Sequence, residues 1–323
     1  MRKNTDLPTG VKTRKKKKFT LDDVQLFFLS LPTVIWYLIF CYLPMFGLVI
    51  AFKNYRVAPG KGFLYSLFYN SKWSGLDNFR FLFANNKATT LNMFRNTVGY
   101  NIIFIILGVV LPVTLAIMIN HLHSQKLAKV TQTAMFLPHF LSWVVVGYFV
   151  FAFLSTDNGL VNRTLQKLGI DTVKWYQKDA IGYWPFFLIF LHVWKTIGYS
   201  MVVYLSSIKG IDASLYEAAM IDGANGWNKF TNITLPLLSP VTFYVLITSL
   251  IGGFQVFVEV QVMTPNGGPN YSSATVVFYL YEKAFTNGQL GYGSAVAVIL
   301  ATIIFIITAI NFWGQDKWVK TID

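Results

Sequence analysis

Polar and ionisable side chains inside apolar stretches are the residues of this 323-residue chain that could carry chemistry. In the apolar stretch 180–208, His192, Lys195 and Tyr199 recur at helical spacing and would share one face. Burying charge in a membrane is costly and therefore marks function by default. These three residues are candidates for the lining of a translocation path. The alternative for Lys195 is structural, a bond to a backbone carbonyl or to an acid on a neighbouring helix.

Gln255 and Glu259 extend this set of candidates near the end of the apolar stretch 235–258. They are four residues apart, so on a continuous helix they would lie on one face. We interpret them as further candidates for the path. The alternative is that Glu259 simply lies at the membrane–water interface.

Motifs of enzymes and metal sites are absent from the sequence. It has no G-x-x-x-x-G-K-[ST] phosphate loop, no G-x-S-x-G, no H-E-x-x-H and a single cysteine, Cys41. We therefore predict that the chain is not an enzyme and binds no cofactor or metal itself. Any ATP and magnesium would be bound by a partner.

The composition indicates a membrane protein. Hydrophobic residues make up 54% and charged residues 13% of the chain, against about 25% charged residues in a typical soluble domain. A net charge of +13 could suggest nucleic acid, but eight of the 27 Lys and Arg residues lie within the first 18 positions. A basic segment ahead of a first span is more simply an orientation signal, so no nucleic-acid partner is expected.

Apolar stretches long enough to cross about 30 Å of hydrocarbon occur six times. We therefore predict an all-α integral membrane fold with six transmembrane helices. Their approximate ranges are 25–52, 96–120, 132–154, 180–208, 235–258 and 291–315.

The predicted domains are a basic cytoplasmic tail at 1–24, a membrane domain at 25–315 and a cytoplasmic C-terminus at 316–323. Six spans place both termini on one side. Because the predicted inner segments hold 14 basic residues and the outer ones 12, the orientation depends on the tail, where the positive-inside rule is strongest. Two outer segments are expected to be ordered: 53–95, folding on the outer membrane surface or a partner, and 159–169, a short amphipathic helix.

Residues 217–240, EAAMIDGANGWNKFTNITLPLLSP, form a polar insert between two apolar stretches. Ser214 and Glu217 have the spacing of a capping box, Gly223 suits a helix end, Asn225 could cap a second short helix and Pro236 suits the start of the next span. Two short helices bent at Gly223 would form a docking surface on the inner side. An ordinary connector with the same caps is an equal alternative on these residues alone.

The same insert resembles the EAA loop of ABC importer permeases, whose pattern is EAA-x-x-D-G-A followed by F-x-x-I-x-L-P. The coupling loop at about 209–236 would contain the matching residues Glu217, Ala218, Ala219, Asp222, Gly223, Ala224, Phe230, Ile233, Leu235 and Pro236.

Further stretches, such as GLDNFRFLF from Gly75, VWKTIGYSMVVYL from Val193 and GGPNYSSATVVFYLYEKAF from Gly267, resemble the LplB-like oligosaccharide permeases. These form a branch of the maltose-type carbohydrate importers that includes alginate permeases. Lys195 belongs to the W-K-x-x-G pattern of that branch.

The resemblance implies a type I importer fold in a bacterial plasma membrane and the import of an oligosaccharide. Its implied partners are an ATPase dimer, which binds ATP and Mg and holds the coupling helices, a second homologous permease and an extracytoplasmic solute-binding protein. The basic outer segments would suit an acidic, uronate-containing sugar, although they would equally suit anionic lipid headgroups.

Two other hypotheses stay open at this point. One is a stand-alone secondary transporter that uses Lys195 and Glu259 as an ion or proton relay. The broken helices and paired halves typical of such transporters are not evident in the sequence. The other hypothesis is a membrane scaffold without transport activity.

Overall fold

The computed structural model describes residues 21–84, 87–177, 180, 182–268 and 271–322. Residues 1–20 of the predicted tail therefore lie outside the described residues. The chain forms two units, 1–47 and 48–323. In the first unit, α1 (Leu21–Tyr37) continues through the π-helical turn η1 (Leu38–Tyr42) into the 3-10 helix η2 (Leu43–Phe52). The first five residues of η2, 43–47, belong to this unit. Asp23–Phe52 is long and apolar enough to cross a membrane.

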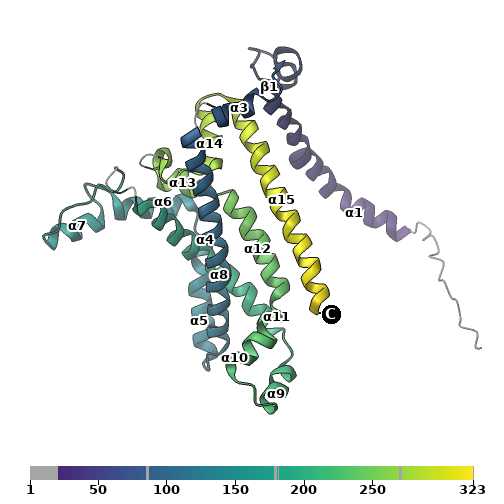
Figure 1. Cartoon of the computed structure of the whole chain (residues 1–323), viewed down its shortest axis with the longest axis vertical. Coiled ribbons are helices and arrows are strands. Elements are labelled where there is room, and N and C mark those ends of the chain that lie inside the picture. The colour runs from purple at the N-terminus through teal and green to yellow at the C-terminus, as the bar shows by residue number, and fades with distance from the viewer. Residues whose placement is uncertain (1–20, 85–86, 178–179, 181, 269–270, 323) are drawn as a thin grey trace, which may run out of the picture. The chain divides into compact units, whose positions relative to one another are not determined.

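The second unit is built almost entirely of helices (Figure 1). In chain order its elements are β1 (Lys53–Asn54), α2 (Phe63–Tyr65), η3 (Ser66–Asn70), β2 (Lys72–Trp73), α3 (Asp77–Ala84), α4 (Lys87–Asn120), α5 (Gln125–Phe136), η4 (Leu137–Phe140), α6 (Trp143–Leu154), α7 (Leu160–Lys167), α8 (Tyr183–Lys209), α9 (Ala213–Ile221), α10 (Gly226–Lys229), η6 (Phe230–Thr234), α11 (Leu235–Leu237), α12 (Ser239–Phe254), α13 (Val258–Met263), η7 (Pro265–Gly267), α14 (Val276–Tyr281), η9 (Glu282–Thr286) and α15 (Leu290–Ile322).

Among the residues that the structure describes, four helices are long and apolar enough to span a membrane by themselves, namely Asp23–Phe52, Ala88–Asn120, Tyr183–Lys209 and Leu290–Gln315. These agree with four of the six predicted stretches. The other two are bent pairs, and counting each pair as one span gives up to six. Each pair interrupts the single helix predicted for its stretch, so the structure contains broken helices that were not evident in the sequence.

The sharper break follows η4, where Gln125–Phe140 and Trp143–Leu154 meet at 94°. Leu141 has an extended backbone (φ −68°, ψ 135°), and a new helix begins at Ser142, whose hydroxyl accepts a hydrogen bond from Val144 N–H at 3.2 Å. Serine is a strong N-cap residue. The sequence L-S-W therefore ends one helix and starts another inside a continuous apolar stretch, which hydropathy alone does not reveal.

The second bend, 62°, separates Gly226–Leu237 from Ser239–Phe254. Pro240 lies in the first turn of α12, where its missing N–H costs nothing. α12 ends at Phe254, four residues before the predicted end of this stretch. Residues 255–257 consequently lie between helices α12 and α13.

Helices α4, α8 and α12 pack against one another and form the centre of the second unit (Figure 1). Two clusters of buried apolar side chains hold them together, one including Trp184 and Met263 and the other including Met201 and Tyr204. Between α4 and α12, the buried Asn101 amide donates to Leu250 O at 2.9 Å. Polar bonds of this kind add to close packing between membrane helices.

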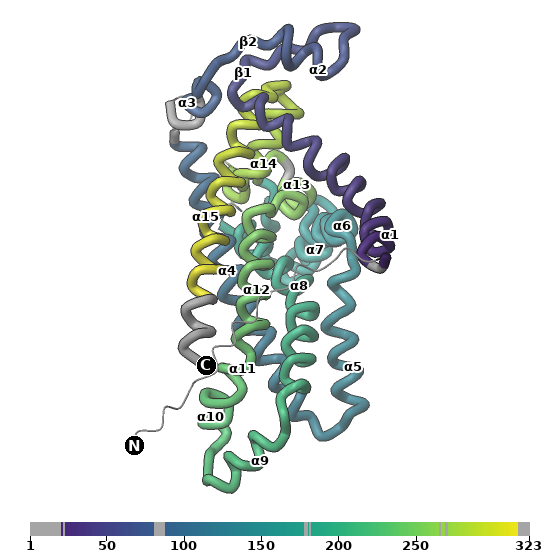
Figure 2. The backbone as a smooth tube through the Cα atoms, turned by 90° about the vertical axis from the view of Figure 1, so that its right-hand side faces the viewer, coloured from purple at the N-terminus to yellow at the C-terminus, as the bar shows by residue number. Residues whose placement is uncertain are grey.

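The end of the unit opposite α9 and α10 carries a small folded cap (Figure 2). β1 and β2 pair antiparallel, with Lys53 opposite Trp73, and the buried Asn78 amide donates to Ala51 O at 2.8 Å and to Lys53 O at 3.0 Å. Residues 53–84 of the predicted outer segment are therefore folded, with Asn78 bound to the backbone at residues 51 and 53. The predicted short helix at 159–169 is α7.

Gly198 on α8 lies against the backbone of α5. A Cβ atom at this position would fall on the carbonyl oxygen of Met135 and within 2.8 Å of Phe136 Cα. Because the obstacle is backbone, it cannot turn aside as a side chain would. Gly198 thus sets how closely the first half of the broken span approaches α8.

We expect Gly198→Ala to push α5 away from α8 and to lower the free energy of unfolding by about 2 kcal/mol, the usual cost of overpacking. Thermal unfolding of the purified protein in detergent measures this. Gly99→Ala on α4 is the matched control, because nothing lies within 4 Å of a Cβ there. Equal melting temperatures for Gly198→Ala and the wild type would contradict the assigned contact.

Candidate functional site

The predicted docking segment consists of two short helices separated by a tight turn. α9 ends at the C-cap residue Asp222, and Gly223 follows with φ +77°, the left-handed geometry that favours glycine. Asn225 then caps α10 by accepting from Asn228 N–H at 2.8 Å. The bend at Gly223 and the Asn225 cap are confirmed.

The start of α9 differs from the prediction. Asp212 is the N-cap, and its carboxylate accepts from Ser214 N–H at 2.9 Å, a bond that lowers the pKa of this carboxyl. Ser214 therefore lies inside the helix, and the predicted capping box of Ser214 and Glu217 was wrong. Asp212 acts as a simple N-cap, a role that aspartate fills well, and Leu215 three residues on cannot complete a capping box.

Most side chains of this segment are exposed. Glu217 and Ala218 lie on the open surface of α9, Ala219 and Ala224 are half-buried, and Asp222 and Gly223 are exposed. Large apolar side chains are exposed beside them, with Ile221 at 87% and Trp227 at 69%. Among the described residues, Asp212 and not Glu217 caps α9, and the exposed Glu217 side chain lies on the surface of that helix.

A hydrogen bond ties α9 to the chain that leads into the next span. Tyr216 Oη and Thr234 Oγ1 are 2.9 Å apart, and Thr234 is buried at the end of η6. Of the predicted loop residues that follow, Phe230 is half-buried against the inner apolar cluster, Leu235 begins α11 and Pro236 lies in its first turn. α9 is thereby linked to the base of α12.

A polar cavity of about 300 Å³ lies among α4, α8, α12 and α13. Its walls combine aromatic rings, hydroxyl groups and one carboxylate. The lining residues are Phe104, Leu107, Gly108, His139, His192, Val193, Thr196, Ile197, Tyr199, Ser200, Tyr244, Val245, Thr248, Ser249, Gly252, Gly253 and Glu259. A few polar groups in an otherwise apolar, aromatic cleft are typical of small-ligand sites.

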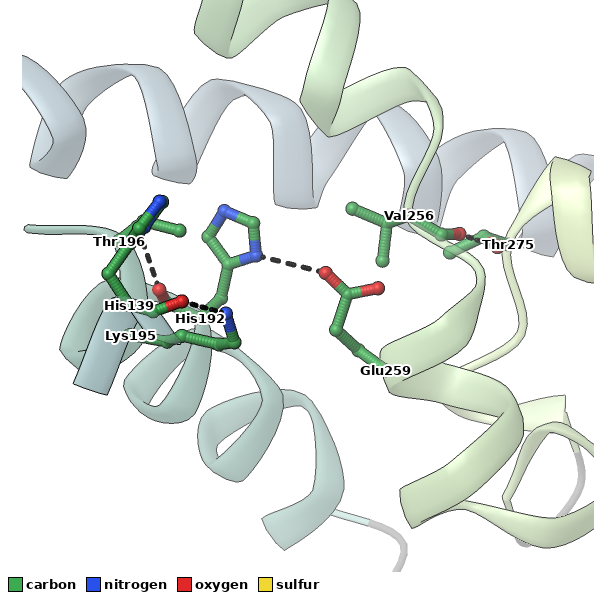
Figure 3. Close-up of polar contacts among 7 residues, drawn as sticks. All are labelled: His139, His192, Lys195, Thr196, Val256, Glu259 and Thr275. Atoms are coloured by element: carbon green, nitrogen blue, oxygen red, sulfur yellow. Dashed lines mark hydrogen bonds and ion pairs between the residues drawn. The ribbon is translucent and has the colours of Figure 1, made fainter. Parts of the chain in front are cut away.

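Glu259 and His192, which both line this cavity, point toward each other (Figure 3), with His192 Nδ1 3.4 Å from Glu259 Oε1. The ring of Phe104 stacks on His192 with centroids 3.8 Å apart. Glu259 is held on α13, and the chain before it is fixed by Thr275 Oγ1, which donates to Val256 O at 2.6 Å. The break after α12 therefore places a carboxylate in the cavity.

Lys195 binds a backbone carbonyl, which was the structural alternative to a place in the path. Its ammonium donates to His139 O at 2.9 Å and lies 5.3 Å from the ring centroid of Trp143, as Figure 3 shows for the His139 contact. Both partners flank the break between η4 and α6. Lys195 satisfies a carbonyl that the broken helix frees, and it is not among the residues lining the cavity.

The structure thus brings together three of the five predicted path residues, His192, Tyr199 and Glu259. Gln255 is exposed and outside the cavity. It shares no helical face with Glu259, because the helix between them is broken. The other polar lining residues were missed, although Thr196 and Ser200 on α8 and Tyr244 and Thr248 on α12 each recur four residues apart within apolar stretches, a detectable signal.

The role of Lys195 can be tested by two substitutions. We expect Lys195→Met to lower the free energy of unfolding by about 2 kcal/mol, because a buried carbonyl loses a charged donor, and to reduce transport with it. Lys195→Arg keeps a donor and is expected to retain most of both. Thermal unfolding and uptake are measured together. Loss of uptake in both variants with wild-type stability would instead indicate a role in the path.

The comparisons with known proteins all indicate the same family of membrane transport proteins. Residues 108–317 match the family described as binding-protein-dependent transport system inner membrane component. The arabinooligosaccharides transport system permease protein AraP of Bacillus subtilis (strain 168) is 32% identical over 282 residues, 87% of this chain and 85% of AraP. Protein LplB of the same organism is 30% identical over 292 residues, 90% of this chain and 88% of LplB.

A solved structure of a bacterial ABC transporter that imports the acidic polysaccharide alginate contains a chain with TM-score 0.77 and 30% identity, covering 92% of this chain and 96% of that one. The alginate transporter in complex with an alginate-pentasaccharide-bound periplasmic protein gives TM-score 0.75 at 30% identity, over 90% and 93% of the two chains. The protein therefore belongs to the binding-protein-dependent transport system inner membrane components, as a mostly helical, multi-pass permease subunit of the ABC sugar importers and not an enzyme.

Proposed function

We propose that this chain carries an oligosaccharide from an extracytoplasmic binding protein into the cytoplasm, driven by ATP hydrolysed with Mg on a separate ATPase dimer, and that a second, homologous permease completes the pore. The observation that carries the proposal is the exposed pair of short helices bent at Gly223, in a chain of this family. Each partner is consistent with the family, and the solved alginate complex contains a periplasmic binding protein.

The coupling segment is expected to work as a lever. Exposed apolar side chains on α9 and α10, together with the carboxylates of Glu217 and Asp222, would seat in the ATPase. ATP-driven closure would then rock α9 as a rigid element. Because Tyr216 is bonded to Thr234, the displacement would reach α11 and the base of α12. α12 carries Tyr244 and Thr248 of the cavity wall, so a movement of α12 would change the shape of the cavity.

The polar cavity is the proposed section of the translocation path. Aromatic rings such as Tyr199 and Tyr244 offer stacking surfaces for sugar rings, and the hydroxyl groups of Thr196, Ser200, Thr248 and Ser249 offer hydrogen bonds. With the coupling segment on the inner side, both termini would be cytoplasmic and the β1–β2 cap would face outward. That placement suits docking of a binding protein on the cap and on α7.

The stand-alone secondary transporter gains no support. Its relay would require Lys195 and Glu259 to share a path. Lys195 is instead bound to His139 O at 2.9 Å, outside the cavity that Glu259 lines. The relatives are subunits of binding-protein-dependent systems.

Gly223→Asp tests the lever. At φ +77° a side chain strains the backbone by about 1 kcal/mol, enough to reorient two short helices without preventing insertion. We expect oligosaccharide uptake and substrate-stimulated ATPase activity to be lost in membranes containing the complete transporter, while the amount of inserted protein stays normal.

Gly288→Asp is the matched control, because Gly288 also has a left-handed backbone (φ +65°) and open space around its Cβ position. It lies in the turn before α15, away from the coupling segment, and should leave ATPase coupling intact. Normal uptake by Gly223→Asp would refute the coupling role.

A further inference from the structure

A second cavity, of about 550 Å³, lies between the end of α4 and the coupling segment formed by α9, α10 and η6. Its lining is partly apolar, with Ile117, Met118 and Phe230, and partly polar, with Asn120 and Lys229. None of the described residues that line it is Asp or Glu. The occupant that fits these walls is therefore amphipathic, with an apolar part and an anionic group.

An exposed apolar stripe on α4 runs into this cavity. Its residues follow one another at every fourth position and are all exposed, namely Ile102, Ile106, Val110, Thr114 and Met118. Residues at this spacing lie on neighbouring turns of one helix face. The hydroxyl in the stripe is satisfied, because Thr114 Oγ1 donates to Val110 O at 2.8 Å.

The length of the stripe matches a membrane. At 1.5 Å per residue, positions 102 to 118 cover about 24 Å, most of the roughly 30 Å of hydrocarbon in a bilayer. Thr114 and Met118, at one end of the stripe, also line the cavity. An acyl chain lying along α4 would therefore bring its headgroup to the cavity.

The polar groups of the cavity are available to a headgroup. Lys229 is half-buried and forms no ion pair with a described residue. The side-chain amide of Asn120, the last residue of α4, has no hydrogen-bond partner among the described residues. His121 holds its Nδ1 at 2.8 Å from Ile117 O. The ammonium and the amide are both donors, as a phosphate requires.

We propose that this cavity binds an anionic phospholipid of the inner leaflet, with an acyl chain on the α4 stripe and the phosphate at Lys229 and Asn120. The inference rests on the proposed function for its orientation, since it takes the coupling segment to be cytoplasmic. Pockets with basic residues between membrane helices on that side suit anionic headgroups. A partner helix could cover the stripe, but an anionic lipid also matches the ammonium.

A lipid in this cavity would act on the coupling segment. One wall belongs to α4, which packs against α8 and α12, and the other belongs to the coupling segment. Tyr216 and Thr234, whose hydroxyl oxygens are 2.9 Å apart, both line the cavity. The lipid would therefore connect the packed centre of the unit to the hydrogen bond that links α9 to the base of α12.

Native mass spectrometry of the complete transporter in detergent tests the site, with phosphatidylglycerol and phosphatidylcholine of identical acyl chains as probes. We expect Lys229→Gln to weaken binding of one phosphatidylglycerol per copy of this chain about fivefold, the effect of one basic residue near an anionic headgroup. Binding of phosphatidylcholine should not change. Lys229→Arg keeps the charge and should bind phosphatidylglycerol as the wild type does.

Lys126→Gln is the matched control, because Lys126 is exposed on α5 and lies outside the lining of the cavity. It should leave binding of phosphatidylglycerol unchanged. An excess of inorganic phosphate should not displace the lipid, because phosphate has no acyl chain to lie on α4. Equal phosphatidylglycerol binding by the wild type and Lys229→Gln, an equal loss in Lys126→Gln, or displacement by phosphate would overturn the proposal.

Uptake by cells separates this outcome from failure of the proposed function. If the lipid binds as expected but deleting the gene leaves uptake of every oligosaccharide intact, the import function alone is refuted. If deletion abolishes uptake while Lys229→Gln binds phosphatidylglycerol like the wild type, the lipid site alone is refuted.

Discussion

A carbonyl freed by a helix break inside a membrane has no water to bond and must find a donor within the protein. This constraint organises the centre of the second unit. His139 O, at the 94° break, takes the ammonium of Lys195 at 2.9 Å. Val256 O, in the break after α12, takes the hydroxyl of Thr275 at 2.6 Å. Each break is thus fixed by one side chain from another element, and the breaks in turn shape the polar cavity.

Contacts of α5 and η4 also fasten the first half of the broken span to helix α8. Gly198 brings α5 against α8, and Lys195 binds the end of η4 one turn of α8 away. The first half of the broken span is therefore fastened to α8 at two neighbouring points. α8 leads directly through Lys209 to the coupling segment. A displacement of the coupling segment would therefore reach the cavity along α8, as well as through the hydrogen bond between Tyr216 and Thr234.

Local signals in the sequence predicted the features that depend on one residue and its neighbours. The bend at Gly223 and the cap at Asn225 follow from backbone preference alone, and four spans follow from length and hydropathy. The breaks at residues 141 and 255 did not emerge, because the stretches around them are apolar overall despite Ser142 and Gln255. The side chains that stabilise those breaks, Lys195 and Thr275, lie 56 and 19 residues from the carbonyls they bind, so their role becomes visible only when the helices are packed.

In the candidate site, too, local sequence predicted some residues correctly and helix packing decided the others. Helical spacing correctly placed His192 and Tyr199 in one wall but also implicated Lys195, since spacing cannot tell a lining residue from one that binds a carbonyl beside it. Gln255 was paired with Glu259 on the assumption of a continuous helix, which the end of α12 at Phe254 removes.

Because α12 ends there, Glu259 is carried by a separate short helix and can face α8 instead of following the face of α12. The break therefore does more than interrupt a span. It sets a carboxylate opposite an imidazole within the membrane domain, while the lysine on the same helix as that imidazole is committed to another carbonyl. The packing of broken helices thus places one acid in the cavity wall, next to His192, and keeps Lys195 outside the lining of that cavity.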